Sequence, residues 1–306
     1  MHHMEQHFLG IDIGGTRIKW CLTNDRGTIL ERQTFATNDT PDEMASWRTQ
    51  VLDLIKATAK ATETKGDSLS CGISAPGLVD DQNQRVLFMP ERLKGLENFH
   101  WAQATGRPVV VINDGHSATL AEYETVYKAK GVRHFLMLTL GTGVGGGLVL
   151  NGQLYQGHLQ RAGHMGHMTV DIHGAPTMTN MPGSLEHAMG NFSVGERTHG
   201  SFVSTKELVE AYTNGDPSAK KYWLASIDRL AVALSALANI VSPEVISIGG
   251  GIAHGAGVAL IQPLAEAMER YEWRPGGHRI TIKKATLGTY AGALGAAMFA
   301  RLKKIK

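Results

Sequence analysis

Three glycine-rich turns, each directly after an apolar run typical of a strand, carry the residues best suited to hold an anion. They span Asp12 to Thr16, Gly141 to Gly147 and Gly249 to Ala253. Glycine lets the backbone approach a ligand closely, backbone N–H groups bind phosphate oxygens, and a nearby carboxylate can hold Mg²⁺ through water. Two such turns suit a triphosphate, and the third suits an adenine or ribose. The predicted ATP-binding residues are Asp12, Gly14, Gly15, Thr16, Thr142, Gly143, Gly250 and Gly251.

The turn that begins at Gly141 also satisfies the pattern GxGxxG. A dinucleotide-binding fold would need this pattern to open a helix, with an acid about 20 residues later. The residues after Gly147 are instead strand-like, and Arg161 to Gly166 contains no acid. No Walker A sequence is present either. Taken alone, this turn fits a ligand-free hairpin equally well, and it is the acid-bearing turn at Asp12 that favours phosphate binding.

Asp114 follows Asn113 at the end of a predicted strand and is a candidate general base. Phosphoryl transfer depends mainly on positioning and charge neutralisation, so one carboxylate near a hydroxyl, with Mg²⁺ and backbone donors, would suffice. The alternative is an Asx turn in which Asp114 caps a helix starting at Gly115. The neighbouring glycine turns favour the base.

Four histidines close in sequence are candidate metal ligands, because HxxH can place two imidazoles on one ion. They are His158, His164, His167 and His173. Gly163 and Gly166 argue against a helix that would present them, and no thiolate lies nearby. We expect no metal here and favour a sugar contact for His167, with plain core packing as the alternative.

The elements that position these residues follow from hydrophobic periodicity. Strands are predicted over 8–13, 16–23, 28–34, 69–75, 109–112, 134–140, 147–150 and 245–248, the first three as a meander. Helices are predicted from Thr40-Pro41, with Met44, Trp47, Val51, Leu54 and Ile55 on one face, from Asp216-Pro217, and over 291–302. The apolar run Leu230 to Val241 is interpreted as part of a buried helix. The second half opens with a hairpin like the first, which indicates two related lobes.

The order of these motifs resembles the ROK sugar kinases of the actin and hexokinase superfamily. The matching stretches are FLGIDIGGTRIKW, GISAPGLVD, VVVINDGHSA, LTLGTGVGGGLVLNGQLY, AGHMGH, PGSLE, VISIGGGIA and AGALGAA. The resemblance implies an α/β fold of two ribonuclease-H-like lobes with ATP and sugar in an interlobe cleft. We expect residues 1–115 with the helix 291–306 to form the smaller lobe, and 116–290 the larger.

The resemblance also implies the roles of the site residues. Asp114 would be the general base, and the substrate-binding residues would be Asn113, Asp114, His164, His167, Glu186 and Gly77. Glu186 could instead be a first-turn carboxylate favoured by the helix dipole. This chain departs from the family pattern at His164, where a sugar-binding glutamate is expected, and at 177–184, where hydroxyl residues replace zinc-binding cysteines. We therefore expect no structural zinc, and Mg²⁺ to enter with ATP near Asp12.

Composition excludes several other functions. Lys plus Arg (30) against Asp plus Glu (28) leaves +2 over 306 residues, too balanced for nucleic-acid or membrane binding. The only cysteines, Cys21 and Cys71, indicate a reducing cytoplasm. A family repressor would need a DNA-binding segment before Asp12. We expect a hexose kinase, glucose-like in substrate and homodimeric; the alternatives are an N-acylhexosamine or fructose kinase, or a non-catalytic sugar sensor.

Overall fold

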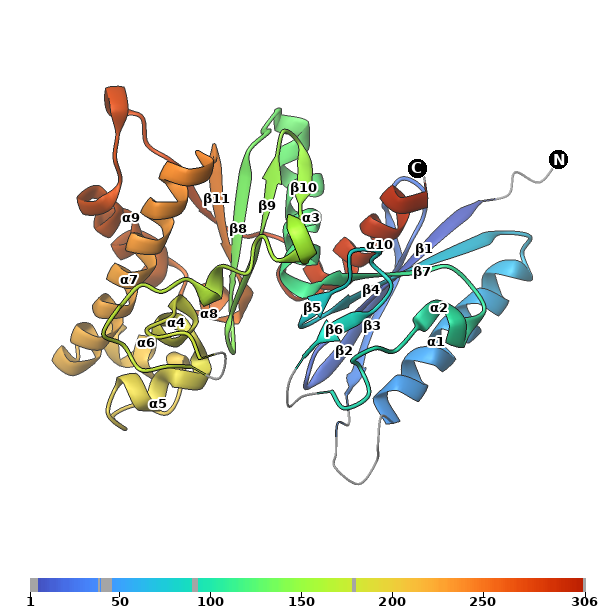
Figure 1. Cartoon of the computed structure of the whole chain (residues 1–306), viewed down its shortest axis with the longest axis horizontal. Coiled ribbons are helices and arrows are strands. Elements are labelled where there is room, and N and C mark those ends of the chain that lie inside the picture. Colours follow the sequence, from blue (N-terminus) through green and yellow to red (C-terminus); the bar gives the residue numbers. More distant parts are fainter. Residues whose placement is uncertain (1–4, 38, 40–45, 90–92, 178–179, 305–306) are drawn as a thin grey trace. The chain divides into compact units, whose positions relative to one another are not determined.

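The computed structural model describes residues 5–37, 39, 46–89, 93–177 and 180–304, and the chain divides into two units (Figure 1). Unit 1 contains Met1–Thr125, Gln156–Ala162 and Thr289–Lys306, and unit 2 contains Val126–Tyr155 and Gly163–Gly288. The chain passes from unit 1 to unit 2 in the π-helical turn Tyr123–Tyr127. The division expected at 115/116 falls inside helix α3 (Asp114–Glu122), which lies in unit 1, and the return of 156–162 to unit 1 had no sequence signal.

Unit 1 is built on a five-stranded mixed sheet with the order β3-β2-β1-β4-β7. Its strands are β1 (Gln6–Ile13), β2 (Arg17–Thr23), β3 (Ile29–Ala36), β4 (Ser68–Ala75) and β7 (Val109–Asn113). The first three form the predicted antiparallel meander, and β4 and β7 add to β1 in parallel. Unit 1 also contains the two-stranded sheet of β5 (Leu78–Val79) and β6 (Val86–Phe88).

Helices cover both faces of this sheet. Leu9, Ile11 and Ile13 pack in one core with the buried face of α1 (Ser46–Glu63) and with α2 (Trp101–Thr105). Successive strand residues point to opposite faces, so Gly10 lies on the other side, against α10 (Ala291–Lys304). The predicted apolar face of α1 is confirmed at Trp47, Val51 and Ile55, whereas Leu54 is half-buried. The predicted start at Thr40-Pro41, and Met44, lie outside the described residues.

Unit 2 repeats this topology with its own sheet, in the order β10-β9-β8-β11-β12. Its strands are β8 (Phe135–Leu140), β9 (Val144–Leu150), β10 (Gln153–Tyr155), β11 (Val245–Gly249) and β12 (Thr281–Lys284). As in unit 1, the first three are antiparallel and the last two add in parallel. The strand predicted from Gly147 begins earlier, at Val144. Gly145 and Gly146 are therefore strand residues, and only 141–143 form the turn.

The helices of unit 2 are α4 (Leu185–Met189), α5 (Val194–Arg197), α6 (Thr205–Thr213), α7 (Pro217–Val241), α8 (Gly250–Ala256) and α9 (Val258–Tyr271). The predicted start of α7 is confirmed, because Asp216 Oδ1 accepts a hydrogen bond from Ala219 N at 2.7 Å and Pro217 takes the first position. Among the described residues, α7 alone is long and apolar enough to cross a membrane. It packs on α9, α6 and α4, with Trp223 fully buried, as the predicted core helix would.

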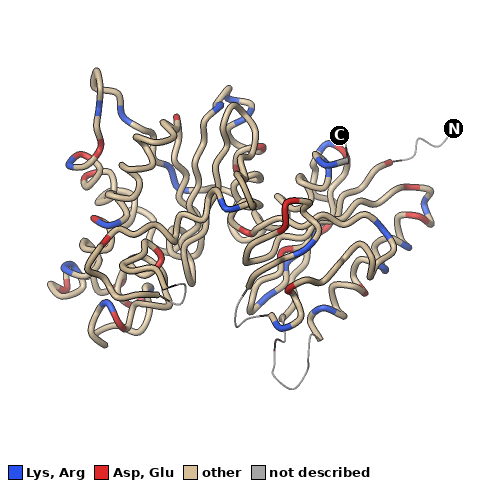
Figure 2. Tube along the Cα trace, viewed as in Figure 1, with Lys and Arg blue, Asp and Glu red and all other residues tan. Residues whose placement is uncertain are grey.

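Charged residues of both signs are interspersed along the chain of each unit (Figure 2). In α10, small residues let the helix backbone lie directly against the sheet, and Ser117 Oγ of α3 donates to Gly292 O at 2.7 Å. The helix α10 therefore connects β1, which precedes the first glycine turn, with α3, which begins at Asp114.

Candidate active site

The first glycine turn joins β1 to β2 and presents its backbone to solvent. Gly14 N donates to Arg17 O at 3.1 Å, which closes the turn, and Gly15 and Thr16 are exposed. Thr37 donates two hydrogen bonds to carbonyl oxygens of the turn: its hydroxyl donates to Gly14 O at 2.6 Å, and its backbone N–H donates to Thr16 O at 3.0 Å. Because these carbonyls are turned toward Thr37, the outer side of the turn suits an anion.

Asp12 lies two residues before this turn, on the central strand of the sheet. Ser74 Oγ on β4 donates to Asp12 Oδ1 at 2.7 Å. Burial raises the pKa of Asp12 above its ordinary value, while the Ser74 hydrogen bond and the Lys19 charge oppose that shift. A cation beside this carboxylate would offset its lost hydration. Gly292 also matters here, because a Cβ at this position would lie 2.5 Å from Asp12 Cγ.

Asn113 fixes the start of α3 and so the position of Asp114. Its Oδ1 accepts from Gly115 N at 2.9 Å and His116 N at 3.3 Å, which is an N-cap. Its Nδ2 donates to Gly77 O at 3.0 Å. The capping role considered for Asp114 thus falls mainly to Asn113, although Asp114 Oδ1 also accepts from Gly115 N at 2.8 Å.

Asp114 has the properties of a base that works near neutral pH. Asp114 as a whole residue is exposed to solvent. The protein packed around its carboxylate nevertheless removes part of the hydration of the charged form, which raises its pKa to about 6. The nearby Asp12 carboxylate raises the pKa further. Hydrogen bonds from Gly115 N, Asp114 N and Asn113 oppose the shift. Two carboxylates in one unit, both with raised pKa values, are typical of a functional site.

The neighbouring His116 is fully buried at the first turn of α3. Its Nε2 lies 2.5 Å from Ala162 O, so this nitrogen carries the proton, and burial lowers the pKa of the imidazole. Ala162 ends the 156–162 segment and is the first residue of the AGHMGH stretch, which contains the predicted sugar-binding residues His164 and His167. No sequence pattern predicts this contact.

In unit 2, the turn from β8 to β9 lies against Glu186. Gly141 N donates to Gly143 O at 2.9 Å, and Glu186 Oε2 accepts from Val144 N at 3.1 Å. A Cβ on Gly143 would overlap the Glu186 carboxylate and fall 2.9 Å from its Cδ. Only glycine therefore allows this approach. Glu186 is also in the first turn of α4, so the dipole-stabilised alternative and a ligand-facing role are compatible.

The third glycine run lies where a strand is followed directly by a helix. β11 ends at Gly249, and α8 begins directly at Gly250, whose φ of +87° favours glycine. A Cβ at Gly250 would also fall 2.6 Å from Leu140 N, at the end of β8. Gly250 and Gly251 are exposed. The turn is therefore a strand-to-helix connection that brings bare backbone beside the β8–β9 turn.

The candidate histidines are not gathered into a metal-binding cluster within the part of the chain that the structure describes. The rings of His164 and His167 lie 6.2 Å apart and nearly parallel, at 9°, and both residues are half-buried. Nδ1 of His167 is buried and has no hydrogen-bond partner among the described residues. Within 5–37, 39, 46–89, 93–177 and 180–304, no three His, Cys, Asp or Glu side chains could hold a metal ion.

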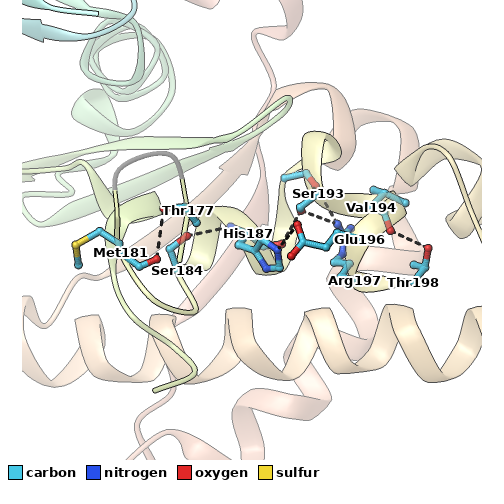
Figure 3. Close-up of polar contacts among 10 residues, drawn as sticks. Thr177, Met181, Ser184, His187, Ser193, Val194, Glu196, Arg197 and Thr198 are labelled. Carbon is cyan, nitrogen blue, oxygen red and sulfur yellow. Dashed lines mark hydrogen bonds and ion pairs between the residues drawn. The ribbon is translucent and has the colours of Figure 1, made fainter. Parts of the chain in front are cut away.

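The family's zinc module does not fit the residues of this chain. Thr177 Oγ1 lies 3.4 Å from Met181 O, and Ser184 Oγ caps α4 by accepting from His187 N at 3.1 Å (Figure 3). Both hydroxyls are thus used in local hydrogen bonds, and neutral hydroxyls are poor zinc ligands. The third replaced position, Thr179, and its neighbour Met178 lie outside the described residues.

Each unit gathers its predicted residues at one edge of its sheet. In unit 1, the turns after β1, β4 and β7 supply Asp12, Gly14, Gly15, Thr16, Gly77, Asn113 and Asp114. In unit 2, the turn between β8 and β9, the start of α8 and helix α4 supply Thr142, Gly143, Gly250, Gly251 and Glu186. Carboxyl ends of parallel strands are a common place for ligands in such sheets. Sequence reasoning missed Ser74 and Gly292, whose motifs it quoted without assigning them a role.

A family model described as the ROK family matches residues 8–303. The chain belongs to the ROK family. The resemblance inferred from its motifs is therefore confirmed. This ROK protein is 30% identical to a glucokinase of Halalkalibacterium halodurans over 321 residues, covering 95% of this chain and 94% of that protein. It is 29% identical to an N-acetylmannosamine kinase of Yersinia pestis over 299 residues, covering 96% and 98%.

Solved structures agree with this assignment. A ROK hexokinase from Thermus thermophilus matches with a TM-score of 0.83 and 29% identity, covering 98% of this chain and 99% of that one. A ROK family glucokinase from Streptomyces griseus, in complex with glucose and AMPPNP, matches with a TM-score of 0.75 and 27% identity, covering 97% and 99%. The predicted fold class, an α/β fold of the actin and hexokinase superfamily, is confirmed.

Proposed function

We propose that this ROK protein is an ATP-dependent sugar kinase that transfers the γ-phosphoryl group to a hydroxyl of a hexose. The observation that carries the proposal is Asp114, a carboxylate with a pKa raised to about 6 in the same unit as the acid-bearing glycine turn. Family membership and relatives named glucokinase and N-acetylmannosamine kinase support the reaction class.

Asp114 would accept the proton of the sugar hydroxyl as its oxygen attacks the γ-phosphorus. A base must be deprotonated at the working pH yet basic enough to take a proton, and a pKa near 6 satisfies both needs near pH 7. Asn113 holds the start of α3 and so directs Asp114. With a proton acceptor in place, the remaining requirement is to neutralise charge on the transferring group.

Two regions would bind ATP. In unit 1, the exposed amides of Gly15 and Thr16 suit phosphate oxygens, and Asp12 would hold Mg²⁺ through water. Bound there, Mg²⁺ supplies positive charge to the phosphates. In unit 2, the turn at Thr142 and Gly143 would bind further phosphate oxygens, and Gly250-Gly251 would lie against the nucleoside. The S. griseus glucokinase, solved with glucose and AMPPNP, supports both substrates.

The sugar would contact Asn113, Gly77, His164, His167 and Glu186. Glucose is the first candidate substrate, and an N-acylhexosamine or fructose is the second. His164 stands where the family pattern has glutamate, so one donor and one acceptor replace two acceptor oxygens. That change alters which hydroxyl or acyl pattern is complemented. We further propose a cytoplasmic homodimer, as the motif resemblance implies.

A coupled ADP-release assay with ATP and Mg²⁺ tests the proposal directly. The panel contains glucose, fructose, mannose, N-acetylglucosamine and N-acetylmannosamine, with ATP alone as the blank. We expect sugar-dependent ADP release with one preferred sugar, and a phosphorylated product detectable by mass spectrometry. Saturable binding of a sugar by calorimetry, without ADP release from any member of the panel, would support a non-catalytic sugar sensor instead.

A further inference from the structure

The segment that follows α4, residues 190–193, contacts the β8–β9 turn through its backbone. Asn191 N donates to Gly141 O at 3.0 Å, and Phe192 N donates to Thr142 O at 3.1 Å. Two carbonyl oxygens of the turn are therefore directed at the 190–193 segment and already hydrogen-bonded. A carbonyl oxygen directed at a phosphate would repel it, so the 190–193 segment determines whether the turn presents donors or acceptors.

Three side chains hold this segment, and Arg197 on α5 is the one that ties it to the core (Figure 3). Ser193 Oγ donates to Gly190 O at 3.0 Å, and Asn191 Oδ1 accepts from Thr205 N at 2.8 Å. Arg197 Nη1 donates to Gly190 O at 2.9 Å and to Ser193 Oγ at 3.2 Å, and its Nε donates to Ser226 Oγ on α7 at 3.3 Å. Ser193 Oγ in turn lies 2.6 Å from His187 O. The guanidinium thus joins the 190–193 segment to the long core helix α7.

The guanidinium of Arg197 is largely removed from water, which is costly for a cation unless hydrogen bonds replace its hydration. Burial lowers its pKa to about 10, and no carboxylate among the described residues offsets the lost hydration. Its acceptor, Gly190 O, lies at the end of α4, where carbonyl groups carry partial negative charge. The planar guanidinium presents five N–H donors in a fixed fork across three nitrogens, whereas a lysine ammonium carries its three donors on a single nitrogen.

The short helix α4 also contacts this turn, through the side chain of Glu186. Glu186 Oε2 accepts from Val144 N at 3.1 Å, directly after Gly143. The turn is therefore held at Gly141 and Thr142 by the segment after α4, and at Val144 by α4 itself. The first of these supports comes from residues directly after the end of α4, and Arg197 binds the carbonyl of Gly190 at that end.

We propose that Arg197 is a positioning residue for the β8–β9 turn: it holds residues 190–192 against Gly141 and Thr142 and thereby sets the affinity for nucleotide. The inference rests on the proposed function, because it assumes that this turn binds phosphate. Its competing explanation is a purely structural arginine whose loss lowers stability without a selective effect on ATP.

The test compares Arg197→Met, Arg197→Lys and a matched control, Arg274→Gln. Arg274 is another arginine of unit 2 whose side chain is mostly buried; among the described residues it pairs with Glu272 at 2.8 Å and with Glu269, and has no ion pair or hydrogen bond to the turn. Hydrogen–deuterium exchange follows the amides of 190–193 and 141–144, and thermal melting reports global stability. Steady-state kinetics give KM for ATP and for the preferred sugar separately. If Arg197→Met does not fold, Ser193→Ala removes part of the same network with a smaller change.

We expect Arg197→Met to speed exchange at 190–193 and to raise KM for ATP about tenfold, a coupling of ordinary size, with a smaller change for the sugar. Arg197→Lys should recover part of the loss, and Arg274→Gln should change neither quantity. Unchanged exchange in Arg197→Met overturns the inference, as does a KM for ATP that shifts no more than in Arg274→Gln at equal melting temperature. Faster exchange with unchanged KM for ATP overturns instead the nucleotide role proposed for the turn.

Discussion

The two sheets share one topology but differ in the chemistry at their first turn. In unit 1, Asp12 pairs with Lys19 across the β1–β2 hairpin, one position before the last pair, Ile13 and Ile18. In unit 2, the position one before the last pair of the β8–β9 hairpin is Thr139, opposite Gly145. The carboxylate of unit 1 thus has a neutral hydroxyl as its counterpart in unit 2.

Both turns are held by hydrogen bonds, with Thr37 in unit 1 and with Glu186 and the segment after α4 in unit 2, but the contacts around the counterpart positions differ. In unit 1, side chains act on the carboxylate, with Ser74 donating to Asp12 and Gly292 leaving room for it. In unit 2, backbone hydrogen bonds act on the turn itself, from Asn191 and Phe192. Under the proposed function this difference would be a division of labour, in which unit 1 would supply the proton acceptor and cation ligand and unit 2 would supply amide donors.

The largest effect should follow from Asp114→Asn, which removes the base from unit 1. We expect kcat to fall by about 10²- to 10⁴-fold, or roughly 3 to 5 kcal/mol of barrier, because asparagine cannot accept the hydroxyl proton. The folded state disfavours the charged carboxylate, since its pKa is raised to about 6, so any penalty is present at neutral pH and absent below pH 4. The variant should therefore melt no earlier than the parent at pH 7. Near-normal turnover would refute the assignment.

Gly292→Ala should have the next largest effect, because it displaces Asp12 without touching the turn. The added Cβ would fall 2.5 Å from Asp12 Oδ1. We expect kcat/KM for ATP with Mg²⁺ to fall about 10- to 100-fold, the size typical of a misplaced supporting group. Gly255→Ala in α8 is the control, since nothing lies within 4 Å of its added Cβ. Equal kcat/KM in Gly292→Ala and Gly255→Ala would contradict the assignment of Asp12 to the ATP-binding site.

The acidic limb of the pH profile of kcat/KM should follow the protonation of Asp114 in unit 1. The pKa of Asp114 is raised to about 6, so below pH 6 the base is increasingly protonated, and kcat/KM should fall about tenfold per pH unit. Above pH 7 the base is fully deprotonated and this limb should be flat. Assays from pH 4.5 to 8 at constant ionic strength measure the limb, with melting at each pH as the control. A flat profile down to pH 5 would show that Asp114 is not the base.

Much of unit 1 could be predicted from local pattern. The meander, the buried strands and the apolar face of α1 follow from the spacing of apolar residues such as Trp47, Val51 and Ile55. The motifs located Asp114 and the glycine turns, although the order of strands had to come from the resemblance. Ser74 and Gly292 could not be found in this way. Their contacts to Asp12 depend on strand pairing and helix packing between distant segments.

The errors in unit 2 have a common physical cause. The sequence pattern places Gly145 and Gly146 in a turn, because glycines that cluster after a predicted strand are typical of a turn whose backbone approaches a ligand. They belong to β9, where a Cβ on Gly146 would lie 2.5 Å from Met137 O, so glycine serves close approach here. Gly250 likewise opens a helix beside β8. Composition alone does not separate a glycine needed for a turn from one needed for close packing.

The smallest expected effect comes from making unit 2 resemble unit 1. Thr139→Asp would place a carboxylate at the counterpart of Asp12, and Thr139→Asn is its neutral, isosteric control. If the β8–β9 turn binds phosphate through its amides, the added negative charge should raise KM for ATP by about three- to tenfold, as expected for partly screened charges at short range. This rise in KM for ATP should shrink with added salt. The KM of Thr139→Asp for the sugar, and both KM values of Thr139→Asn, should stay near the parent values. A lower KM for ATP in Thr139→Asp would mean that this turn also takes a cation, and the division of labour between the units would be wrong.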